Sequence, residues 1–296
     1  MASRVLVPLD GSPLADRILD RLAPIARDGD VAIELLAVIP EDASERARAH
    51  LQRMQGRLRA QGLTVHYHIR KGDPATEILH LAEMLKPELI AMSSHGRSGP
   101  ARWFLGSVAE RVLRRARHPV LVANPGGLER APAEASRPFR TILVPLDGSK
   151  RGADILDLVA QVADAYDAEV VLLHVAPEST MGVPVAMPPI ETIPTQAEAE
   201  ALIEPARARL EKAGRRVRVA VHFGDPATKI LAAAEAYGAD LIALATHGHT
   251  GVARWAFGSV AEKVLRASPV PLLVKRTVTA NWSVPLAPEP VAEVAR

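Results

Sequence analysis

The chain has 296 residues, of which 36 are basic and 34 acidic, so its net charge is +2, and 48% of its residues are apolar. This composition excludes a disordered or fibrous protein, and at roughly 150 residues per domain the length favours two domains. The absence of cysteine excludes disulfides, thiolate-bound zinc and iron–sulfur clusters. No stretch approaches the roughly 18 apolar residues of a membrane span, so we expect a soluble cytoplasmic protein without a membrane partner.

The chain repeats itself, and the repeat determines the predicted architecture. Three segments recur: residues 4–12 at 141–149, 72–79 at 224–231, and 95–122 at 247–274. In the last pair, 17 of 28 positions are identical. The offset between copies rises from 137 to 152 residues along the chain, which places an insertion of 15 residues in the second copy. Two copies of one domain therefore lie head to tail.

The repeat also sets the predicted domain boundaries. The first domain covers residues 3–123, and a linker rich in Pro, Gly and Ala follows at 124–139. The second domain covers 140–276 and carries the insertion at about 177–195, which contains five prolines. This insertion is either a lid or a tolerated surface excursion, and the second interpretation is favoured. Residues 277–296 are predicted to be a flexible tail.

Within each copy, short apolar runs alternate with longer amphipathic stretches, a pattern typical of a parallel sheet with helical connections. In the first copy, the predicted strands are 4–9, 31–38, 64–69, 88–93 and 119–123. Ser12 before a proline and Asp73 before a proline predict helix N-termini, and Gly62 predicts a helix end. The fold class is α/β and doubly wound, so ligands are expected beyond the carboxyl ends of the strands.

Asp10 and Asp147 end the first strand of each copy. A carboxylate there can accept hydrogen bonds from an exocyclic amine or a ribose hydroxyl. The alternative is an aspartate that only bonds the backbone of its own turn. The residues leave both interpretations open.

A glycine-containing loop follows the fourth strand in both copies. Residues 93–96 read Ser-Ser-His-Gly and residues 245–248 read Ala-Thr-His-Gly, and after nine residues each loop reaches Gly-Ser, at 106–107 and 258–259. Glycines allow a phosphate to approach the backbone, and the free N–H groups of a helix N-terminus attract anions. Without a ligand, Ser107-Val-Ala-Glu and its repeat can serve as capping boxes.

The remaining polar residues give weaker indications. His95 and His247 lie in no arrangement typical of a hydrolase and are expected to make structural hydrogen bonds. Trp103 and Trp255 are expected to pack. A basic cluster at 111–118 is interpreted as a solvated helix face, so no nucleic-acid partner is predicted. The motifs of P-loop NTPases, dinucleotide oxidoreductases, zincins and serine hydrolases are absent, so no metal site or catalytic residue is assigned.

With these motifs together, the chain resembles a tandem member of the universal stress protein family. The resemblance covers nearly all of residues 3–276 and implies two Rossmann-like domains, similar to adenine nucleotide alpha hydrolases, each with a five-stranded parallel sheet. It implies ATP as the ligand, with ADP or AMP as alternatives and an accompanying Mg²⁺ left open. The residues implied for adenine are Pro8, Leu9, Asp10, Val38, Pro145, Leu146, Asp147 and Val175. Those implied for ribose and phosphates are Met92, Gly96, Arg97, Gly106, Ser107, Val108, Leu244, Gly248, Gly258, Ser259 and Val260.

Both copies depart from the family pattern at one position. The loop motif of the family that the chain resembles is G-x-x-G, nine residues, then G-[ST]. Its first glycine is Ser93 in the first copy and Ala245 in the second, so a Cβ is added beside the expected sugar. We expect weakened binding there. The predicted function is a regulatory, stress-response nucleotide-binding protein without proficient catalysis. The alternatives are a nucleotide-free docking module for a protein partner, or a slow ATPase or autophosphorylating protein.

The fifth strands, 119–123 and 271–274, are expected at sheet edges with unpaired backbone groups. In the family that the chain resembles, such edges pair between domains. Joined by a short linker, the two copies are therefore predicted to form a pseudo-dimer within one chain. Further homodimerisation is left open.

Overall fold

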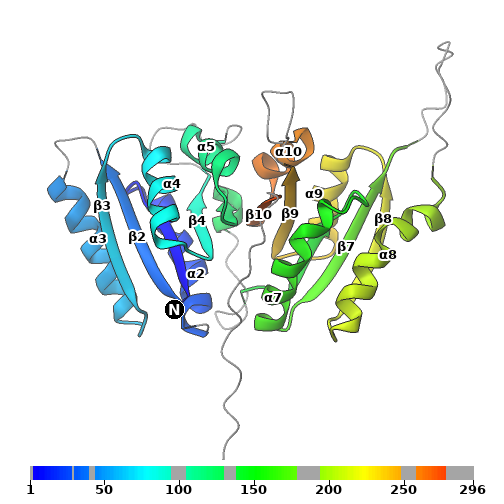
Figure 1. Ribbon diagram of the computed structural model, residues 1–296, viewed down its shortest axis with the longest axis horizontal. Helices are drawn as coiled ribbons and strands as arrows, with labels where there is room; N and C mark the ends of the chain where they lie inside the picture. The colour runs from blue at the N-terminus through cyan, green and yellow to red at the C-terminus, as the bar shows by residue number, and fades with distance from the viewer. Residues whose placement is uncertain are drawn as a thin grey trace, which may run out of the picture.

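The computed structural model describes residues 3–28, 30–39, 44–94, 105–129, 138–178, 194–247 and 258–277. These residues form one ten-stranded sheet in the order β3-β2-β1-β4-β5-β10-β9-β6-β7-β8 (Figure 1). The strands are β1 Arg4–Pro8, β2 Ala32–Ile39, β3 Val65–Lys71, β4 Leu89–Ser93, β5 Val120–Ala123, β6 Thr141–Pro145, β7 Glu169–Ala176, β8 Val217–Phe223, β9 Leu241–His247 and β10 Leu272–Thr277.

The sheet is two copies of one five-stranded pattern. All pairs within a half are parallel, and β5 and β10 join the halves as the one antiparallel pair among the described strands. In the register of that pair, Leu121 lies opposite Leu273. The predicted α/β class, the parallel strands of each half and the pairing of the fifth strands are therefore confirmed.

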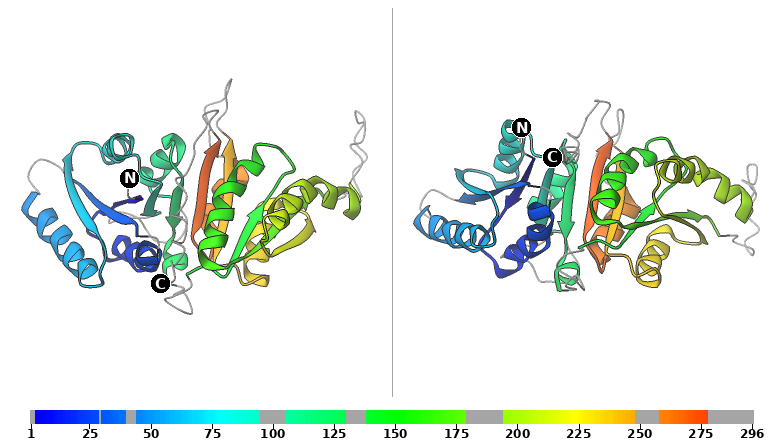
Figure 2. Two further views of the ribbon diagram at one scale, coloured as in Figure 1. Left: turned by 60° about the horizontal axis from the view of Figure 1, so that its bottom comes forward. Right: turned by 90° about the horizontal axis from the view of Figure 1, so that it is seen from below.

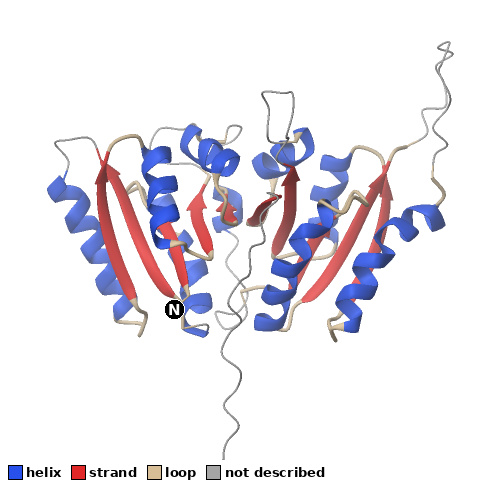
Figure 3. Cartoon of the chain, in the orientation of Figure 1, coloured by secondary structure: helices blue, strands red, loops and turns tan. Residues whose placement is uncertain are grey.

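Helices cover both faces of the sheet (Figures 2 and 3). They are α1 Pro13–Asp16, α2 Ile18–Asp28, α3 Ser44–Arg59, α4 Pro74–Leu85, α5 Ser107–Arg115, α6 Pro125–Glu129, η1 Gly152–Ile155, α7 Leu156–Tyr166, α8 Gln196–Lys212, α9 Pro226–Ala236 and α10 Ser259–Ala267. Residues of α2, α3, α7 and α8 pack on one face and those of α4, α5, α9 and α10 on the other. Each apolar layer contains residues of both halves, so the core continues across the junction.

Local sequence explains where the helices begin and end. Ser12 and Asp73 are N-caps whose side chains accept from Ala15 N and Thr76 N, and a proline follows each cap, as predicted. Gly62 has φ +82°, a left-handed conformation that glycine adopts at little cost after a helix.

The junction between the halves contains buried polar contacts as well as the β5–β10 ladder. Asn124 Nδ2 donates to the carbonyl of Ser268 at 2.6 Å, and Gly127 N donates to Asn124 Oδ1 at 2.7 Å. The buried Arg21 donates to the Gly127 carbonyl at 2.9 Å. These bonds attach α6 to both halves, since buried polar groups are costly without partners.

The connecting segments are described in part. The predicted linker contains α6, and Phe139 at its end is buried against Tyr166 with ring centroids 5.6 Å apart. Thr195 begins α8 with a capping box that involves Glu198. The greater part of the predicted insertion and all but the first residue of the predicted tail lie outside the described residues.

Candidate functional site

The candidate site of each half lies where the strand order reverses, beyond the carboxyl ends of its two central strands. In the first half these strands are β1 and β4, which pair with each other in parallel. Asp10 follows β1, and Ser93 ends β4. The N-terminus of α5 approaches the same edge, since Gly106 N donates to the Ser94 carbonyl at 2.9 Å. The structure therefore brings the predicted aspartate and the predicted helix start to one crevice.

A cavity of about 220 Å³ occupies this crevice in the first half. Backbone and side chains from β1, β2, β4, α4 and the start of α5 form its walls. The residues are Pro8, Leu9, Asp10, Ala15, Leu36, Val38, Pro74, Ile78, Met92, Ser93, Ser94, Gly106, Ser107, Val108 and Ala109. The aspartate thus lies on one wall and the first turn of α5 on another.

The second half has a cavity of about 310 Å³ at the corresponding place. Its residues are Pro145, Leu146, Asp147, Gly152, Leu173, Val175, Pro226, Ile230, Leu244, Ala245, Thr246, Gly258, Val260 and Ala261. Each of these positions is the repeat equivalent of a position in the first cavity. The two cavities are therefore the same site, built twice.

The sequence prediction located most of the walls. All predicted residues that the structure describes line their cavity, except Ser259, which is the first residue of α10. Gly96, Arg97 and Gly248 lie outside the described residues, as do His95 and both loop tryptophans, Trp103 and Trp255. His247 ends β9.

Both aspartates form the turn that the sequence left open as an alternative. Asp10 Oδ1 accepts from Ser12 N at 2.9 Å and from Ser12 Oγ at 2.7 Å, and Asp147 Oδ1 accepts from Ser149 N at 2.9 Å. Each carboxylate also lines its cavity and is exposed. The turn holds the aspartate at the cavity wall, so the two interpretations describe one arrangement.

The interpretation of Ser107 and Ser259 as the N-caps of capping boxes is wrong. Gly106 and Gly258, not the serines, are the N-caps of α5 and α10, and neither helix has a side-chain cap among the described residues. Glu110 pairs instead with Arg114 at 2.5 Å. The first N–H groups of a helix have no partner within the helix itself. In both halves they therefore face a cavity without the cap that the serines were expected to supply.

The glycines at these N-caps are not required by the backbone. Gly106 has φ −61° and ψ 141°, and Gly258 has φ −58° and ψ 144°, values that any residue adopts. Among the described residues, a Cβ built on Gly258 has no heavy atom within 4 Å. A side chain here meets open space and fills the cradle above the helix N-terminus, where a phosphate fits.

Sequence reasoning missed the wall supplied by the fourth helix of each half. Pro74 and Ile78 of α4 line the first cavity, and Pro226 and Ile230 of α9 line the second. The repeated segment at 72–79 and 224–231 contains all four residues, so its recurrence was the available indication. These residues close the apolar side of each cavity.

Ion pairs connect the α4 and α5 rim and its repeat. Arg111 donates to both oxygens of Asp73 at 2.9 and 2.8 Å, whereas Lys263 contacts Asp225 at 3.6 Å. The hydrogen bond from Arg111 is the main cause of a lowered pKa at Asp73, with Thr76 second. The pKa of Asp225 is also lowered, mainly by the hydrogen bond from the Thr228 side chain.

Several residues of the basic cluster at 111–118 form ion pairs with neighbouring carboxylates. Besides Arg111 and Arg114, Arg117 pairs with Glu83 at 3.8 Å. His118 is buried, and burial lowers its pKa. The cluster therefore contacts neighbouring carboxylates and the core.

The described part of the chain has neither a metal-binding cluster nor a membrane-spanning helix. It contains no group of three or more His, Cys, Asp or Glu side chains placed to hold a metal ion. It also contains no helix with the length and apolar character that crossing a membrane requires.

Comparison with known proteins agrees with the duplicated architecture. The model of the universal stress protein family matches residues 1–124 and again residues 138–276. Universal stress protein MJ0531 of Methanocaldococcus jannaschii is 30% identical over 136 residues, which cover 40% of this chain and 80% of the relative. Universal stress protein Rv1996 of Mycobacterium tuberculosis is 25% identical over 313 residues, covering 92% of this chain and 94% of the relative.

A solved structure shares the arrangement of both halves. The crystal structure of a universal stress protein from Archaeoglobus fulgidus superimposes with a TM-score of 0.71 at 26% identity. The match covers 92% of this chain and 96% of that chain. The joined pair of domains therefore has a counterpart among solved structures.

Proposed function

Because the chain belongs to the universal stress protein family, with one matched domain in each half, we propose that it is a regulatory, stress-response protein that binds one adenine nucleotide in each of its two cavities. The nucleotide is ATP, or ADP or AMP after turnover elsewhere. Its binding changes the surface presented to a protein partner, and the chain does not itself need proficient catalysis.

The observation that carries this proposal is the pair of equivalent cavities. Each contains an aspartate held by a turn, apolar walls, and a helix N-terminus without a side-chain cap among the described residues. An adenosine phosphate offers matching groups: donors for the carboxylate, a planar apolar base and an anion for the helix N-terminus. The cavity of about 310 Å³ lies at the lower end of the volumes of about 300–1,000 Å³ typical of small-molecule sites.

In the first half, the base lies against Val38 and beside Asp10. In the second half, it lies against Val175 and beside Asp147. The ribose lies beside the end of β4 or β9. The phosphates lie over the N-terminus of α5 or α10 and extend towards solvent. Arg97, predicted to contact phosphate in the first half only, stays a prediction.

The two departures from the family pattern do not block the cavities. Ser93 is buried and lines the first cavity, and Ala245 lines the second, yet both cavities remain open. The added Cβ atoms therefore reduce the space beside the sugar without filling it. This favours nucleotide binding over the nucleotide-free docking module.

Native mass spectrometry with added ATP tests the proposal by counting bound nucleotides. We expect two on the wild-type chain, one on Gly106→Val, one on Gly258→Val and none on the double variant. Valine at position 258 meets no described atom at its Cβ and has a permitted φ, so we expect the fold to be retained while the cradle is filled. The same titration with ADP and AMP ranks the three nucleotides.

Gly56→Val is the matched control. Gly56 lies in α3, away from both cavities, and a Cβ built on it also meets nothing within 4 Å. This variant should bind two nucleotides. A wild-type chain that binds none, or a Gly258→Val chain that binds as many as wild type, contradicts the proposal.

The slow ATPase or autophosphorylating activity is separated from regulatory binding by phosphate release. If the chain is a regulator, a sample that retains two nucleotides releases no more phosphate than buffer. Steady release that is lost in a His95→Ala, His247→Ala variant would assign catalysis to these histidines instead. The cytoplasmic location, homodimerisation, the partner protein and bound Mg²⁺ stay predictions.

A further inference from the structure

A second groove lies behind the nucleotide cavity of the first half. Its volume is about 730 Å³, and it shares Leu9, Asp10 and Val38 with the nucleotide cavity. The two spaces therefore lie on either side of one wall, which includes Asp10. The groove opens between the end of β2 and the N-terminal half of α3.

One side of this groove is apolar and the other is basic. Ala37 and Ile39 of β2 and Ala47 of α3 supply apolar surface, while Arg46 and Arg53 of α3 supply cations. Neither arginine pairs with a carboxylate among the described residues. Among the described residues, the groove therefore presents two guanidinium groups without a carboxylate partner beside an apolar floor.

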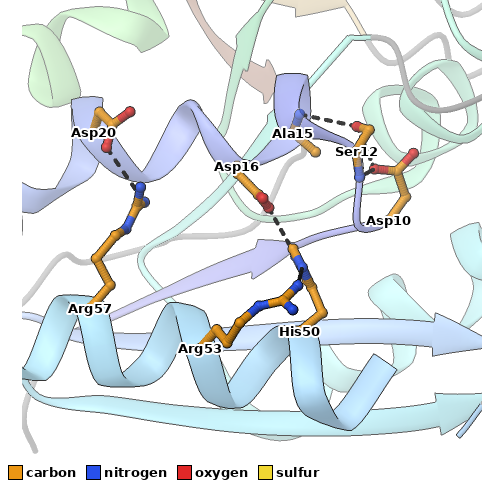
Figure 4. Close-up of polar contacts among 8 residues, drawn as sticks. All are labelled: Asp10, Ser12, Ala15, Asp16, Asp20, His50, Arg53 and Arg57. Atoms are coloured by element: carbon orange, nitrogen blue, oxygen red, sulfur yellow. Dashed lines mark hydrogen bonds and ion pairs between the residues drawn. The ribbon is translucent and has the colours of Figure 1, made fainter. Parts of the chain in front are cut away.

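Two carboxylates near the groove, Asp10 and Asp16, make hydrogen bonds within the described part of the chain (Figure 4). Asp16 Oδ1 lies 3.0 Å from His50 Nε2, and Asp10 Oδ1 accepts from Ser12. Arg53 Nη2 lies 3.4 Å from His50 Nδ1. A guanidinium can only donate, so His50 Nδ1 accepts and Nε2–H donates to Asp16. His50 therefore links Asp16 to Arg53.

The second half shows that its fold does not need this polar set. The repeat equivalents of Asp16, His50 and Arg53 are Ala153, Leu202 and Pro205. Leu202 closes on the turn glycine, since its Cβ lies 3.1 Å from a Cβ built on Gly148.

The neighbouring contact between the same helices is kept in both halves. Arg57 pairs with Asp20 at 3.4 Å, and their repeat equivalents, Arg209 and Asp157, are also paired. The retained pair joins the helices in each half. The set that includes His50 and Arg53 is present in one half alone, where it borders a groove.

The charge of the helix follows the same division. In α3 there are five arginines and one glutamate, whereas α8 has four glutamates and three basic residues. The repeat equivalent of Arg46 is Glu198, which caps its own helix. Positive charge is therefore concentrated beside the groove of the first half.

We propose that this groove binds a phosphorylated small organic molecule, with its phosphate on Arg46 and Arg53 and its uncharged body on the apolar floor. Two guanidinium groups match a phosphate dianion, because charge-assisted N–H to phosphate contacts are strong and directional. The volume of the groove exceeds that of a lone phosphate ion. Its alanines and Ile39 offer no hydrogen bond to a hydrated anion, but they can contact the apolar part of an organic molecule. The site is distinct from the nucleotide cavity, and the second half has Ala153, Leu202 and Pro205 in place of Asp16, His50 and Arg53.

Methyl NMR of the full chain tests this site without added nucleotide. Ile39 lines the groove, while Ile78 and Ile230 line the two nucleotide cavities, so isoleucine δ1-methyl labels report on all three spaces separately. Phenyl phosphate is the probe and phenol the uncharged control. The Ile39 signal is assigned with an Ile39→Val variant.

We expect phenyl phosphate to shift the Ile39 methyl signal saturably and phenol to leave it nearly unchanged. Arg53→Gln should weaken the apparent affinity at Ile39 by about tenfold, since it removes a charge-assisted contact. His50→Leu, which introduces the residue of the second half, should weaken it similarly by closing the groove. Arg48→Gln removes the same charge from the same helix outside the groove, so it should bind like wild type.

Three results would overturn the assignment. The first is an Ile39 signal that does not respond to phenyl phosphate. The second is an equal response to phenol, which would make the groove a purely apolar site. The third is an Arg53→Gln variant with the affinity of Arg48→Gln. A response at Ile78 or Ile230 alone is a case of the first result, and it places the probe in the nucleotide cavities.

Discussion

The two halves of the chain share one fold and one cavity plan, but they differ in the residues around it. Both cavities keep the turn aspartate, the prolines, the valine of the second strand and the helix-start glycine. Four wall positions change: Ala15 becomes Gly152, Met92 becomes Leu244, Ser93 becomes Ala245 and Ser94 becomes Thr246. If the two cavities bind the same ligand, the retained residues are the ones that hold it, while the changed residues accompany cavities of about 220 and 310 Å³.

The halves differ more strongly around α3 and α8, the helices that contact the outer strands of each half. There α3 carries the basic groove, while α8 is net acidic and Leu202 covers the corresponding turn. Because the second half keeps its core without these polar side chains, they are not a requirement of folding. Duplication thus allows both copies to keep a common cavity while one of them also carries a second groove.

The largest expected effect tests whether the halves fold as one unit. Leu6 and Leu143 are repeat equivalents, are fully buried and belong to the same apolar layer. Leu6→Ala and Leu143→Ala should each lower the free energy of unfolding by about 2–5 kcal/mol, because each leaves a cavity in the core. Since the layer is continuous through β5 and β10, urea denaturation should show one transition for either variant.

The control for this prediction is an exposed leucine. Leu202→Ala removes the same atoms from a side chain that is 48% exposed and should cost much less. Two separate transitions, with each substitution moving only its own, would show that the halves unfold independently. The β5–β10 pair would then be a contact between two stable domains.

An intermediate effect is expected where the two turn aspartates differ. A Cβ on Gly152 lies 2.6 Å from Asp147 Oδ1, so Gly152→Ala must displace the carboxylate. If that carboxylate holds a nucleotide, its loss costs about 1 kcal/mol, or roughly a fivefold rise in Kd for ATP. Isothermal titration in a Gly106→Val background isolates the second cavity.

The reverse exchange is the matched control. Ala15 occupies the position of Gly152 in the first half, beside an Asp10 that Ser12 holds through both N and Oγ. Ala15→Gly, measured in a Gly258→Val background, should leave the Kd nearly unchanged. Equal effects of the two substitutions would mean that the glycine does not set the position of Asp147.

The sequence predicted the fold and most of the walls because both are encoded in repeated local patterns. Two copies of Val-Pro-Leu-Asp-Gly-Ser and of Asp-Pro-Ala-Thr give the strand ends and helix starts directly. The second groove was not predictable in this way. It depends on His50 of α3 approaching Asp16 at the end of α1, with Arg53 beside His50, a contact between elements that no local pattern specifies.

The capping boxes show a different kind of error, in which a local pattern was present but the N-cap lies one residue earlier than the pattern predicts. Ser107 and Glu110 have the spacing of a box, but the glycine before them is already the N-cap. A glycine has no side chain with which to cap, so the motif alone cannot reveal that the position is open. Only the backbone angles show it.

The smallest expected effect concerns how acid acts on the two α-helix caps at the rim. The pKa values of Asp73 and Asp225 are lowered in the folded state from the ordinary value of 3.8. Because the folded-state pKa is lowered, each ionised cap contributes its full stabilisation above the ordinary pKa of 3.8. This stabilisation is lost as pH falls through the lowered pKa. Asparagine can still cap but does not titrate, so Asp73→Asn and Asp225→Asn should each lose less stability than wild type on acidification from about pH 5 to about pH 3.

The comparison of the two halves predicts which variant changes more. Arg111 contacts both oxygens of Asp73 and is the main cause of its shift, whereas Thr228 leads at Asp225 and Lys263 contributes less. Urea midpoints across this pH range should therefore flatten more for Asp73→Asn than for Asp225→Asn. Equal slopes would mean that the exposed Arg111 pair is screened by solvent, as surface ion pairs commonly are, and that the caps alone account for the acid sensitivity of this rim.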